Sequence, residues 1–519
     1  MNFMDIGLCG LAGALQGVSI ALPVQVSTSP SWWVQMMGML MFLYVLQKTQ
    51  HALLATLMYG ASWMGASCWW LYISMNTYGG LNGFLSFTAV AALSTVLSLY
   101  YVGCIAIYQS FTKSETSSNN QNKSDPRLLA ALWTMAEVAR GTWVSGFGWG
   151  GIGYAHIEGP LAVWAPWVGV YGTAAIACYL CAASTGFIGA ARASQKNVST
   201  MTIIVLLTIG LNALKPEFTE SNGVIDVALL QGNIPQDEKF TAQTGVEKAL
   251  TWYPKTLKAQ TSSLVIAPET AIPLLPQQWP KGILEQLTPK QEAEEQTHQQ
   301  AILIGLPLGS LQEGYTNSVV ALTSKEQMPW QYDKHHLVPF GEFTPQGMRW
   351  FTEMMSIPLG DFKKGKVNTP SFSWKQQEIA ANICYEDLFT EELAKRFDGT
   401  HPAPTIWVNF SNLAWFGNTL AMDQHLHISR MRALEFERPF VKSSNTGITA
   451  VVNHKGEVTH QMDRLKPGVL LAEVEGRTGI TPYAYWSARW GVWPIWILCG
   501  LWVAWCAYQK RRVYARRIR

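Results

Sequence analysis

The first fifth of the chain is almost free of charged side chains. Between Ile6 and Thr112 the only Asp, Glu, Lys or Arg residue is Lys48. A soluble domain of that size carries many charges on its surface, so this stretch cannot be one. About 20 consecutive apolar residues form a helix long enough to cross a bilayer. The sequence therefore predicts that the amino-terminal region is embedded in a membrane.

The distribution of charge also predicts where the membrane region ends. Residues 1–215 hold 13 Asp, Glu, Lys and Arg residues, residues 216–489 hold 54, and residues 490–519 hold six, all basic. We therefore predict, within these boundaries, a membrane domain of about seven helices, a water-soluble domain, and a last transmembrane helix with a basic cytoplasmic tail. The eight predicted spans are residues 6–24, 32–47, 51–75, 82–110, 127–145, 160–191, 200–214 and 490–509.

Basic residues in the predicted loops indicate the orientation. With the amino terminus in the cytoplasm, every cytoplasmic loop carries a basic residue, as the positive-inside rule requires. These residues are Lys48, Lys113, Lys123, Arg127, Arg192, Lys196 and the basic tail from Lys510 to Arg519. Seven crossings then place residues 216–489, which carry 24 basic and 30 acidic side chains, on the opposite side. In a bacterium this corresponds to the inner membrane with a periplasmic domain.

The soluble region alternates β-rich segments with helical ones. Strands are predicted at 224–230, 263–267, 301–306, 318–322, 379–385, 405–410, 447–452 and 470–474, and helices at 243–261, 279–299, 389–397 and 420–438. This alternation is typical of a layered α/β domain. The chain has no dinucleotide fingerprint, Walker loop or nucleic-acid-binding motif, so we expect no cofactor and no nucleic-acid partner.

Three reactive side chains follow one another in the order Glu269, Lys334, Cys384. Cys384 is the only cysteine among residues 216–489, so it has no disulfide partner within that region. Glu269 and Cys384 lie at the ends of predicted strands, where α/β folds usually carry their reactive groups. Acyl transfer needs a nucleophile, a base and a positive group near the carbonyl oxygen. Cys384 can be the nucleophile, Glu269 the base and Lys334 the positive group.

Neighbouring residues could support this chemistry. Glu342 and Glu386 could orient Lys334 or assist the base, and the backbone amide of Tyr385 could donate to an oxyanion. Each residue also has an ordinary interpretation, because an isolated buried cysteine is usually structural and a single Glu or Lys is usually a surface charge. The catalytic interpretation therefore depends on the combination.

The full set of motifs resembles one family. The motifs are Ala267-Pro268-Glu269-Thr270, Lys334 with Leu337-Val338-Pro339-Phe340-Gly341-Glu342, Ile383-Cys384-Tyr385-Glu386, Asn409 to Gly417, Arg430 to Glu435 and Ser444 to Thr449, with Gly79-Gly80 and Glu137 to Tyr154 in the apolar region. Together they resemble the bacterial apolipoprotein N-acyltransferases, which are membrane-embedded members of the nitrilase superfamily. The resemblance covers nearly the whole chain.

This resemblance implies a polytopic helical membrane domain joined to a nitrilase-like α-β-β-α sandwich with a catalytic triad of Glu269, Lys334 and Cys384. Members of the family take an acyl chain from a phospholipid, usually phosphatidylethanolamine, onto the cysteine as a thioester. They pass it to the α-amino group of the diacylglyceryl-cysteine that begins an apolipoprotein, the final step of bacterial lipoprotein maturation. The implied partners are the bilayer, the phospholipid donor and the diacylated apolipoprotein.

The resemblance also implies substrate contacts at Phe240, Asn412, Trp415 and Phe416. The sequence departs from the family pattern at three positions, since the family commonly has Trp where Phe240 stands, an acidic residue at Leu413 and Pro at Gly148. These departures leave the acceptor and acyl-chain contacts open. Read from the residues alone, Trp415-Phe416-Gly417 is either a lid over the substrate or an ordinary packed loop.

Several alternatives stay open at this point. Glu137 and Arg140 are three residues apart on a predicted membrane helix and could form a structural ion pair or bind a lipid head group. The pairs His335-His336 and His425/His427 lack a third ligand, so no metal site is expected. The chain as a whole could instead be a membrane-tethered nitrilase-like amidase, or a transporter or receptor with a ligand-binding globule.

Overall fold

The computed structural model describes residues 3–22, 29–112, 125–188, 195–289, 299–310, 312–324, 327–350, 354 and 361–518. It divides into two compact units. The first, called here the helical unit, comprises residues 1–69, 87–216 and 490–519, and the second, the sandwich unit, comprises residues 70–86 and 217–489. The division falls after residues 216 and 489, and residues 70–86 join the second unit although they precede it in the chain.

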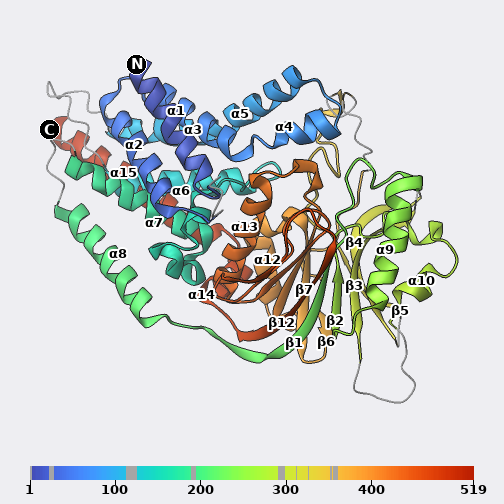
Figure 1. Cartoon of the computed structure of the whole chain (residues 1–519). Helices are drawn as coiled ribbons and strands as arrows, with labels where there is room; N and C mark the ends of the chain where they lie inside the picture. The colour runs from blue at the N-terminus through green and yellow to red at the C-terminus, as the bar shows by residue number, and fades with distance from the viewer. Residues whose placement is uncertain are drawn as a thin grey trace. The chain divides into compact units, whose positions relative to one another are not determined.

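The helices of the first unit coincide with the predicted spans. They are α1 (Phe3–Val18), α2 (Trp32–Lys48), α3 (Ala52–Cys68), α5 (Gly83–Thr112), α6 (Pro126–Thr142), α7 (Ala165–Ile188), α8 (Gln195–Leu214) and α15 (Trp493–Ile518) (Figure 1). Among the described residues, three segments are long and apolar enough to cross a membrane, or four if one bent helix pair counts as a span. These segments are Gly83–Thr112, Pro160–Thr185, Gln195–Leu214 and the pair Pro482–Trp490 with Trp493–Arg512.

The total of eight spans therefore stays a prediction. Helices α1, α2, α3 and α6 have only 16 or 17 residues each, which is short for a bilayer that needs about 20. The orientation also stays a prediction, because Lys113, Lys123 and Arg192 lie outside the described residues.

Glu137 and Arg140 form an ion pair inside the helical unit. Arg140 Nη2 lies 3.2 Å from Glu137 Oε2, and both side chains are almost fully buried. The Tyr101 hydroxyl donates to Glu137 Oε1 at 2.5 Å and accepts from Arg140 Nε at 2.9 Å. Arg140 also donates to the backbone carbonyl of Trp149 at 2.7 Å. The ion pair is therefore present, and fixed protein groups surround it.

The sandwich unit is built on two six-stranded sheets (Figure 1). The first has the order β12-β1-β2-β3-β4-β5 and the second has the order β11-β10-β9-β8-β7-β6. The strands are β1 (Thr219–Gln231), β2 (Leu264–Ala267), β3 (Ala301–Ser310), β4 (Gly314–Thr323), β5 (Gln327–Asp333), β6 (Phe372–Trp374), β7 (Gln377–Ile383), β8 (Ile406–Ser411), β9 (Phe440–Ser444), β10 (Ala450–Val452), β11 (Val458–Gln461) and β12 (Gly468–Gly479).

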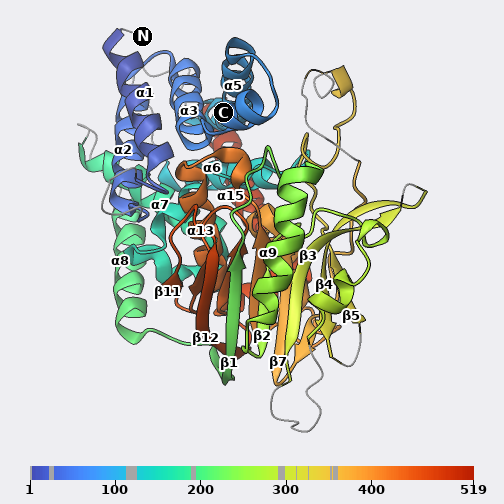
Figure 2. The ribbon, with the colours of Figure 1, turned by 45° about the vertical axis from the view of Figure 1, so that its right-hand side comes forward.

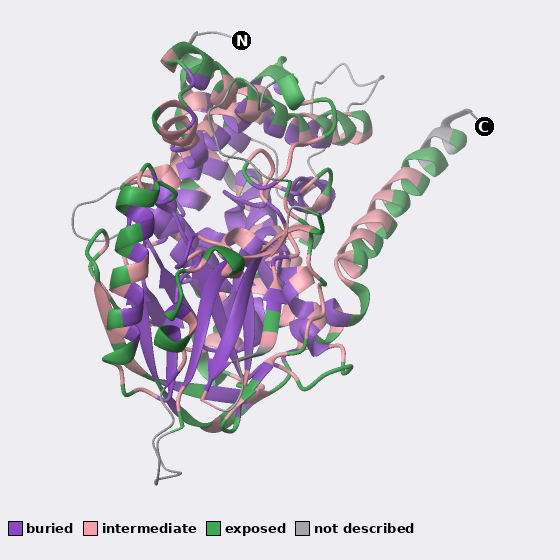
Figure 3. Cartoon of the chain, turned by 90° about the vertical axis from the view of Figure 1, so that its right-hand side faces the viewer, coloured by how far each residue is buried: buried purple, intermediate pink, exposed green. Residues whose placement is uncertain are grey.

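Helices cover the outer face of each sheet. An apolar core that includes Leu229, Ile266 and Val408 lies between the two sheets. Helices α9 (Glu247–Lys258) and α10 (Ile283–Leu287) pack on the first sheet, and α12 (Thr390–Ala394), α13 (Leu420–Phe436) and α14 (Pro482–Trp490) pack on the second (Figure 1). Figure 2 shows α9 against the strands of the first sheet. Strands β2, β8, β9 and β10 are buried along their whole length, and Figure 3 shows the middle of the sandwich as largely buried. The predicted α-β-β-α sandwich is confirmed.

All eight predicted strands exist, but four more were missed. β6 and β11 are short, and β9 carries polar residues in a strand that is fully buried. β5 contains Pro329, which argues against a strand unless the strand lies at a sheet edge, as β5 does. The helix predicted at 279–299 was too long, because the described part is α10 alone and residues 290–298 lie outside the described residues.

Residues 70–86 belong to the sandwich unit although apolar helices flank them in the chain. They contain the short helix α4 (Leu71–Ile73) and a π-helical turn, Ser74–Tyr78. Trp70 Nε1 donates to Gln424 Oε1 on α13 at 3.1 Å. The Trp70 ring also lies 4.3 Å, centroid to centroid, from the ring of Phe416. The predicted span at 51–75 therefore ends early, because its last residues pack against the sandwich unit.

Candidate active site

The candidate residues lie just beyond the ends of strands from both sheets. Glu269 follows β2, Lys334 follows β5 and Cys384 follows β7. β2 is parallel to β1 and β3, and β7 is parallel to β8, so the carboxyl ends of these strands share an edge. Gly305 on β3 makes room for this turn, because a Cβ there would lie 2.4 Å from the Pro268 carbonyl and 2.8 Å from Glu269 Cα.

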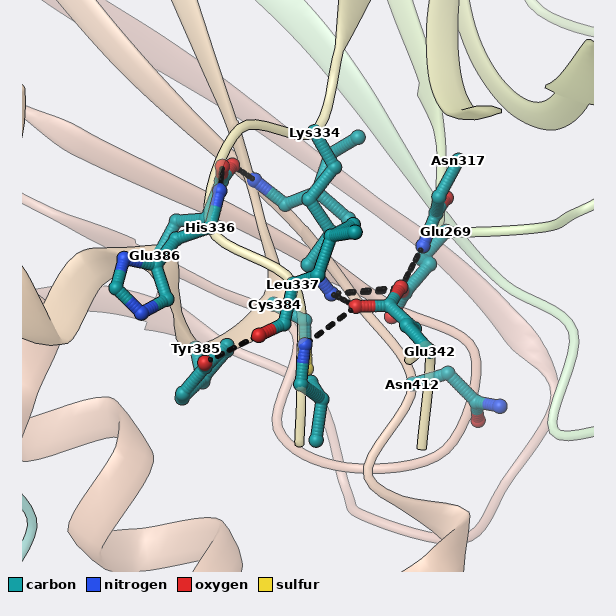
Figure 4. A network of polar contacts seen from close by, with 12 residues as sticks. Glu269, Asn317, Lys334, His336, Leu337, Glu342, Cys384, Tyr385, Glu386 and Asn412 are labelled. Carbon is teal, nitrogen blue, oxygen red and sulfur yellow. Dashed lines mark hydrogen bonds and ion pairs between the residues drawn. The ribbon is translucent and has the colours of Figure 1, made fainter. Parts of the chain in front are cut away.

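Lys334 lies between two carboxylates. Its Nζ is 3.0 Å from Glu342 and 3.6 Å from Glu269 Oε1, and its side chain is 1% exposed. Figure 4 shows these side chains gathered around Cys384. Burial lowers the pKa of Lys334, but the carboxylates of Glu342 and Glu269 outweigh burial and hold the pKa well above its usual value. The lysine is therefore an ammonium at any physiological pH.

Asn317 on β4 joins the two carboxylates. Its Nδ2 donates to Glu269 Oε1 at 2.7 Å and to Glu342 Oε1 at 2.8 Å, and its backbone carbonyl accepts from the Lys334 amide at 2.8 Å (Figure 4). Glu342 Oε2 also accepts from the Val338 amide at 2.8 Å. Asn317 therefore holds the carboxylates of Glu269 and Glu342 in place relative to each other. Sequence reasoning missed this residue, because an asparagine within a strand carries no motif.

Cys384 begins a turn that a non-glycine residue seldom adopts. Its φ is +55°, in the left-handed region, and the residue opens the 3₁₀ turn Cys384–Leu388. Strained backbone of this kind is concentrated at active sites. Burial raises the pKa of the Cys384 thiol, Glu269 and Glu342 add to the rise, and Lys334 opposes it. The resting thiol therefore keeps its proton at neutral pH, and an attacking thiolate needs a base.

Glu386 holds the two halves of the site together. Its Oε1 accepts from the amides of His335 at 2.7 Å and His336 at 2.9 Å, and its Oε2 accepts from the amide of Ile383 at 2.6 Å and from the Tyr332 hydroxyl at 2.8 Å. Burial raises the pKa of Glu386, and its donors oppose the rise. The carboxylate thus joins the residues after Lys334 to the residue before Cys384.

The Tyr385 side chain has a similar bridging contact. Its hydroxyl donates to the Leu337 carbonyl at 2.8 Å (Figure 4), and the Lys334 ammonium lies 5.7 Å from the centre of its ring. The side chain therefore braces the Lys334 loop against the Cys384 turn.

Lys239 is a further cation that sequence reasoning missed. Its side chain is 2% exposed, and its Nζ donates to the backbone carbonyl of Glu269 at 3.2 Å. Burial lowers the pKa of Lys239 to about 8, while Glu269 and Cys384 oppose the fall. A lysine among acidic neighbours in the sequence reads as surface charge, which is why only the fold reveals it.

The predicted substrate contacts differ in their surroundings. Phe240 is half exposed, as a residue that meets a ligand can be, whereas Asn412 is buried and donates to Gln236 Oε1 at 2.7 Å. Asn445 donates to Asn412 Oδ1 at 3.1 Å and to the Ile234 carbonyl at 2.9 Å. Asn412 thus lies in an amide network that joins the loops after β1, β8 and β9.

The turn Ala414–Phe416 packs against residues 70–86. The Trp415 ring lies 5.9 Å from that of Tyr78, centroid to centroid, and Gly417 has φ +61° with Ile73 as the nearest side chain. Leu413 is buried, so the departure from an acidic residue places an apolar side chain in a covered position. Trp415 and Phe416 are therefore part of a packed aromatic cluster with Trp70 and Tyr78.

Known proteins match the chain in both units. Residues 16–183 match the family described as apolipoprotein N-acyltransferase N-terminal domain, and residues 226–483 match the carbon-nitrogen hydrolase family. The apolipoprotein N-acyltransferase of Verminephrobacter eiseniae is 43% identical over 512 residues, which cover 93% of this chain and 92% of the relative. That of Ralstonia nicotianae is 38% identical and covers 87% and 85%.

These relatives extend over the helical unit as well as the sandwich. The matches also contain the region of Glu269, Lys334 and Cys384, the three side chains that the fold brings together. The resemblance noted in the motifs is thereby confirmed over most of the chain, and the protein belongs to the apolipoprotein N-acyltransferase family.

Proposed function

We propose that this protein transfers an acyl chain from a phospholipid, through a thioester on Cys384, to the α-amino group of the diacylglyceryl-cysteine that begins an apolipoprotein. One observation carries the proposal: a buried ammonium, Lys334, lies between Glu269 and Glu342 beside a cysteine with φ +55°. This constellation occurs in a chain that spans 92% of a relative named apolipoprotein N-acyltransferase. The enzyme would catalyse the final step of lipoprotein maturation.

In the first half-reaction Glu269 takes the proton of the Cys384 thiol, and the thiolate attacks the ester carbonyl of the phospholipid. A base is needed because the thiol is protonated at neutral pH in the resting site. Negative charge develops on the carbonyl oxygen, where Lys334 and the backbone amide of Tyr385 would stabilise it. The C–O bond then breaks, Glu269 returns the proton to the departing oxygen, and a lysophospholipid leaves.

In the second half-reaction the neutral α-amino group of the apolipoprotein attacks the thioester carbonyl. A C–N bond forms, Glu269 takes a proton from the nitrogen, and the C–S bond breaks with the Cys384 thiolate as leaving group. The proton then passes to the thiolate, which restores the resting enzyme. An amine competes with water only where the site is dry, and the packed aromatic cluster of Trp70, Tyr78, Trp415 and Phe416 favours such a site.

Glu342, Glu386 and Tyr385 would act as positioning residues. Glu342 keeps Lys334 charged and directed between the carboxylates, as its 3.0 Å contact suggests. Glu386 and the Tyr385 hydroxyl fix the loop after Lys334 relative to the Cys384 turn. Phe240 and the aromatic cluster would contact the acyl chains.

The proposed setting is the bacterial inner membrane, with the sandwich unit on the periplasmic side and phosphatidylethanolamine as donor. The positive-inside pattern of the loops and the apolar helices support this setting. A lipid donor and a lipidated acceptor both partition into the bilayer, so membrane attachment of the enzyme would bring all three together.

The acylation experiment tests the proposal. Purified protein mixed with phosphatidylethanolamine should gain a hydroxylamine-labile acyl mass on Cys384, and a diacylated lipopeptide with a free α-amino group should remove it and become triacylated. An N-acetylated lipopeptide serves as the matched acceptor control. Loss of the acyl group to water at the same rate without acceptor would favour the amidase interpretation, and no adduct at all would defeat the proposal. Phosphatidylglycerol in place of phosphatidylethanolamine tests the donor head group.

A further inference from the structure

Lys442 is a third buried lysine near Cys384, after Lys334 and Lys239. Lys442 on β9 is fully buried. Its ammonium donates to Asn409 Oδ1 on β8 at 2.8 Å and also bonds His425 Nδ1 on α13. A buried ammonium is costly unless its surroundings compensate it, so its neighbours indicate what it does.

Asn409 connects this ammonium to the nucleophile. Its Nδ2 donates to the backbone carbonyl of Cys384 at 2.7 Å and also bonds the side chain of Asn382. Two hydrogen bonds therefore separate the Lys442 ammonium from the carbonyl of Cys384. The Lys442 ammonium polarises the amide of Asn409 through its Oδ1. This polarisation strengthens the hydrogen bond that Asn409 Nδ2 donates to the Cys384 carbonyl.

The same network reaches the Cys384 turn at a second point. His425 Nε2 faces Asp387 Oδ1 at 3.5 Å, and the Ser429 hydroxyl donates to Asp387 Oδ2 at 2.6 Å. Asp387 is the fourth residue of the turn that Cys384 begins. The turn is thus held at its first carbonyl and at its fourth side chain.

This double attachment matches the strain at Cys384. A non-glycine residue with φ +55° persists only where its surroundings impose that conformation. Asn409, which holds the carbonyl, is itself fully buried and held by Lys442. The charge of Lys442 also acts on the thiol, since Lys442 lowers the pKa of Cys384 against the effects of burial, Glu269 and Glu342, in the same sense as Lys334.

We propose that Lys442 is a positioning residue for the nucleophile: through Asn409 it holds Cys384 in its left-handed turn, and its charge favours the thiolate. The inference rests on the proposed function only in taking Cys384 as the nucleophile. The groups that face Lys442 are Asn409, His425, Asp387, Cys384 and Glu269.

Alkylation of Cys384 tests this role without any lipid substrate. The full-length protein in detergent is treated with iodoacetamide between pH 6 and 10, and the Cys384 peptide is quantified by mass spectrometry. Lys442→Met should lower the alkylation rate at pH 7.5 at least tenfold and move the midpoint of the profile to higher pH. Lys442→Arg, which keeps the charge, should recover most of the rate.

Lys395→Met is the matched control, because Lys395 also donates to a backbone carbonyl, that of Ala488 at 3.0 Å, but lies outside the network. It should leave the profile unchanged. Asn409→Ala keeps the charge and removes the link, so it should slow alkylation with a smaller shift of the midpoint. If Lys442→Met does not fold, Asn409→Ala and Lys442→Arg decide the question by the same readout.

The inference is overturned if folded Lys442→Met has the same pH profile of Cys384 alkylation as the wild type. If Lys442→Met cannot be purified, a wild-type profile of Asn409→Ala overturns it. A lower rate with an unchanged midpoint, not recovered in Lys442→Arg, would mean a packing role only and would also overturn it. Failure of the proposed function looks different: the alkylation profile would shift as expected while phosphatidylethanolamine left no acyl group on wild-type Cys384.

Discussion

Both units of this protein bury a carboxylate beside a cation, but the two ion pairs have different surroundings. In the helical unit, Arg140 contacts Glu137, the Tyr101 hydroxyl and backbone carbonyls, which use its donors on fixed protein groups. In the sandwich unit, Lys334 lies between Glu269 and Glu342 beside a thiol. A buried ion pair by itself therefore does not identify an active site.

The two sites differ in the backbone conformation of their residues. Cys384 has φ +55°, whereas Glu137 and Arg140 lie within the regular helix α6. Lys334 also contacts two carboxylates, those of Glu269 and Glu342, whereas Arg140 contacts the single carboxylate of Glu137. The comparison predicts that substitutions in the sandwich site remove activity and that substitutions in the helical pair remove stability.

The largest effect is expected for Cys384→Ala. Without the thiol no acyl-enzyme can form, so transfer of a labelled acyl chain to a diacylated lipopeptide should fall to background, a loss of at least about 10⁴-fold. The thermal unfolding temperature should stay close to that of the wild type. Measurable transfer by this variant would show that another group carries the acyl chain.

Lys334→Met should come next. Removal of one preorganised oxyanion donor typically lowers kcat by about 10²–10³-fold, and here the substitution also leaves Glu269 and Glu342 without their shared cation. Single-turnover acylation of Cys384 by phosphatidylethanolamine should therefore slow at least that much. The matched control is Lys395→Met, which should acylate at the wild-type rate. Equal rates for the two variants would contradict the role assigned to Lys334.

A smaller, pH-dependent effect is expected at Lys239. Because its pKa is lowered to about 8, the ammonium is present below that pH and is lost as the pH rises through about 8. Catalysis that depends on this charge should decline over the same range. Lys239→Arg keeps its charge to much higher pH, so at pH 9 it should retain several-fold more of its pH 7 activity than the wild type retains. An identical alkaline decline in both proteins would exclude Lys239 as its source.

The smallest effect on activity is expected for Arg140→Met. The substitution leaves Glu137 buried without its partner, which typically costs about 3–5 kcal/mol of stability. The unfolding temperature in detergent should therefore fall clearly, while acyl transfer per folded molecule stays within about twofold. If Arg140→Met instead kept the wild-type unfolding temperature and lost activity, the helical pair would have a functional role. That result would favour head-group binding at this pair.

Much of this architecture follows from local patterns. Long uncharged segments predict helices, because a helix satisfies the backbone hydrogen bonds of an apolar segment in lipid within the segment itself. All eight predicted strands were found because β-rich runs bounded by turns are a local signal. β5 and β9 escaped prediction since Pro329 and the polar run Lys442-Ser443-Ser444 are acceptable only in particular sheet positions: an edge for β5, and a buried polar network for β9.

The sequence by itself determined the division into apolar and charged regions and led to the prediction that Glu269, Lys334 and Cys384 act together, because helical length, strand pattern and side-chain chemistry are local properties. Only the tertiary structure decided that Asn317, Lys239 and Lys442 surround those three residues and that residues 70–86 pack with the sandwich. These placements depend on which strands become neighbours and where their ends meet, and that information is shared among segments far apart in the chain.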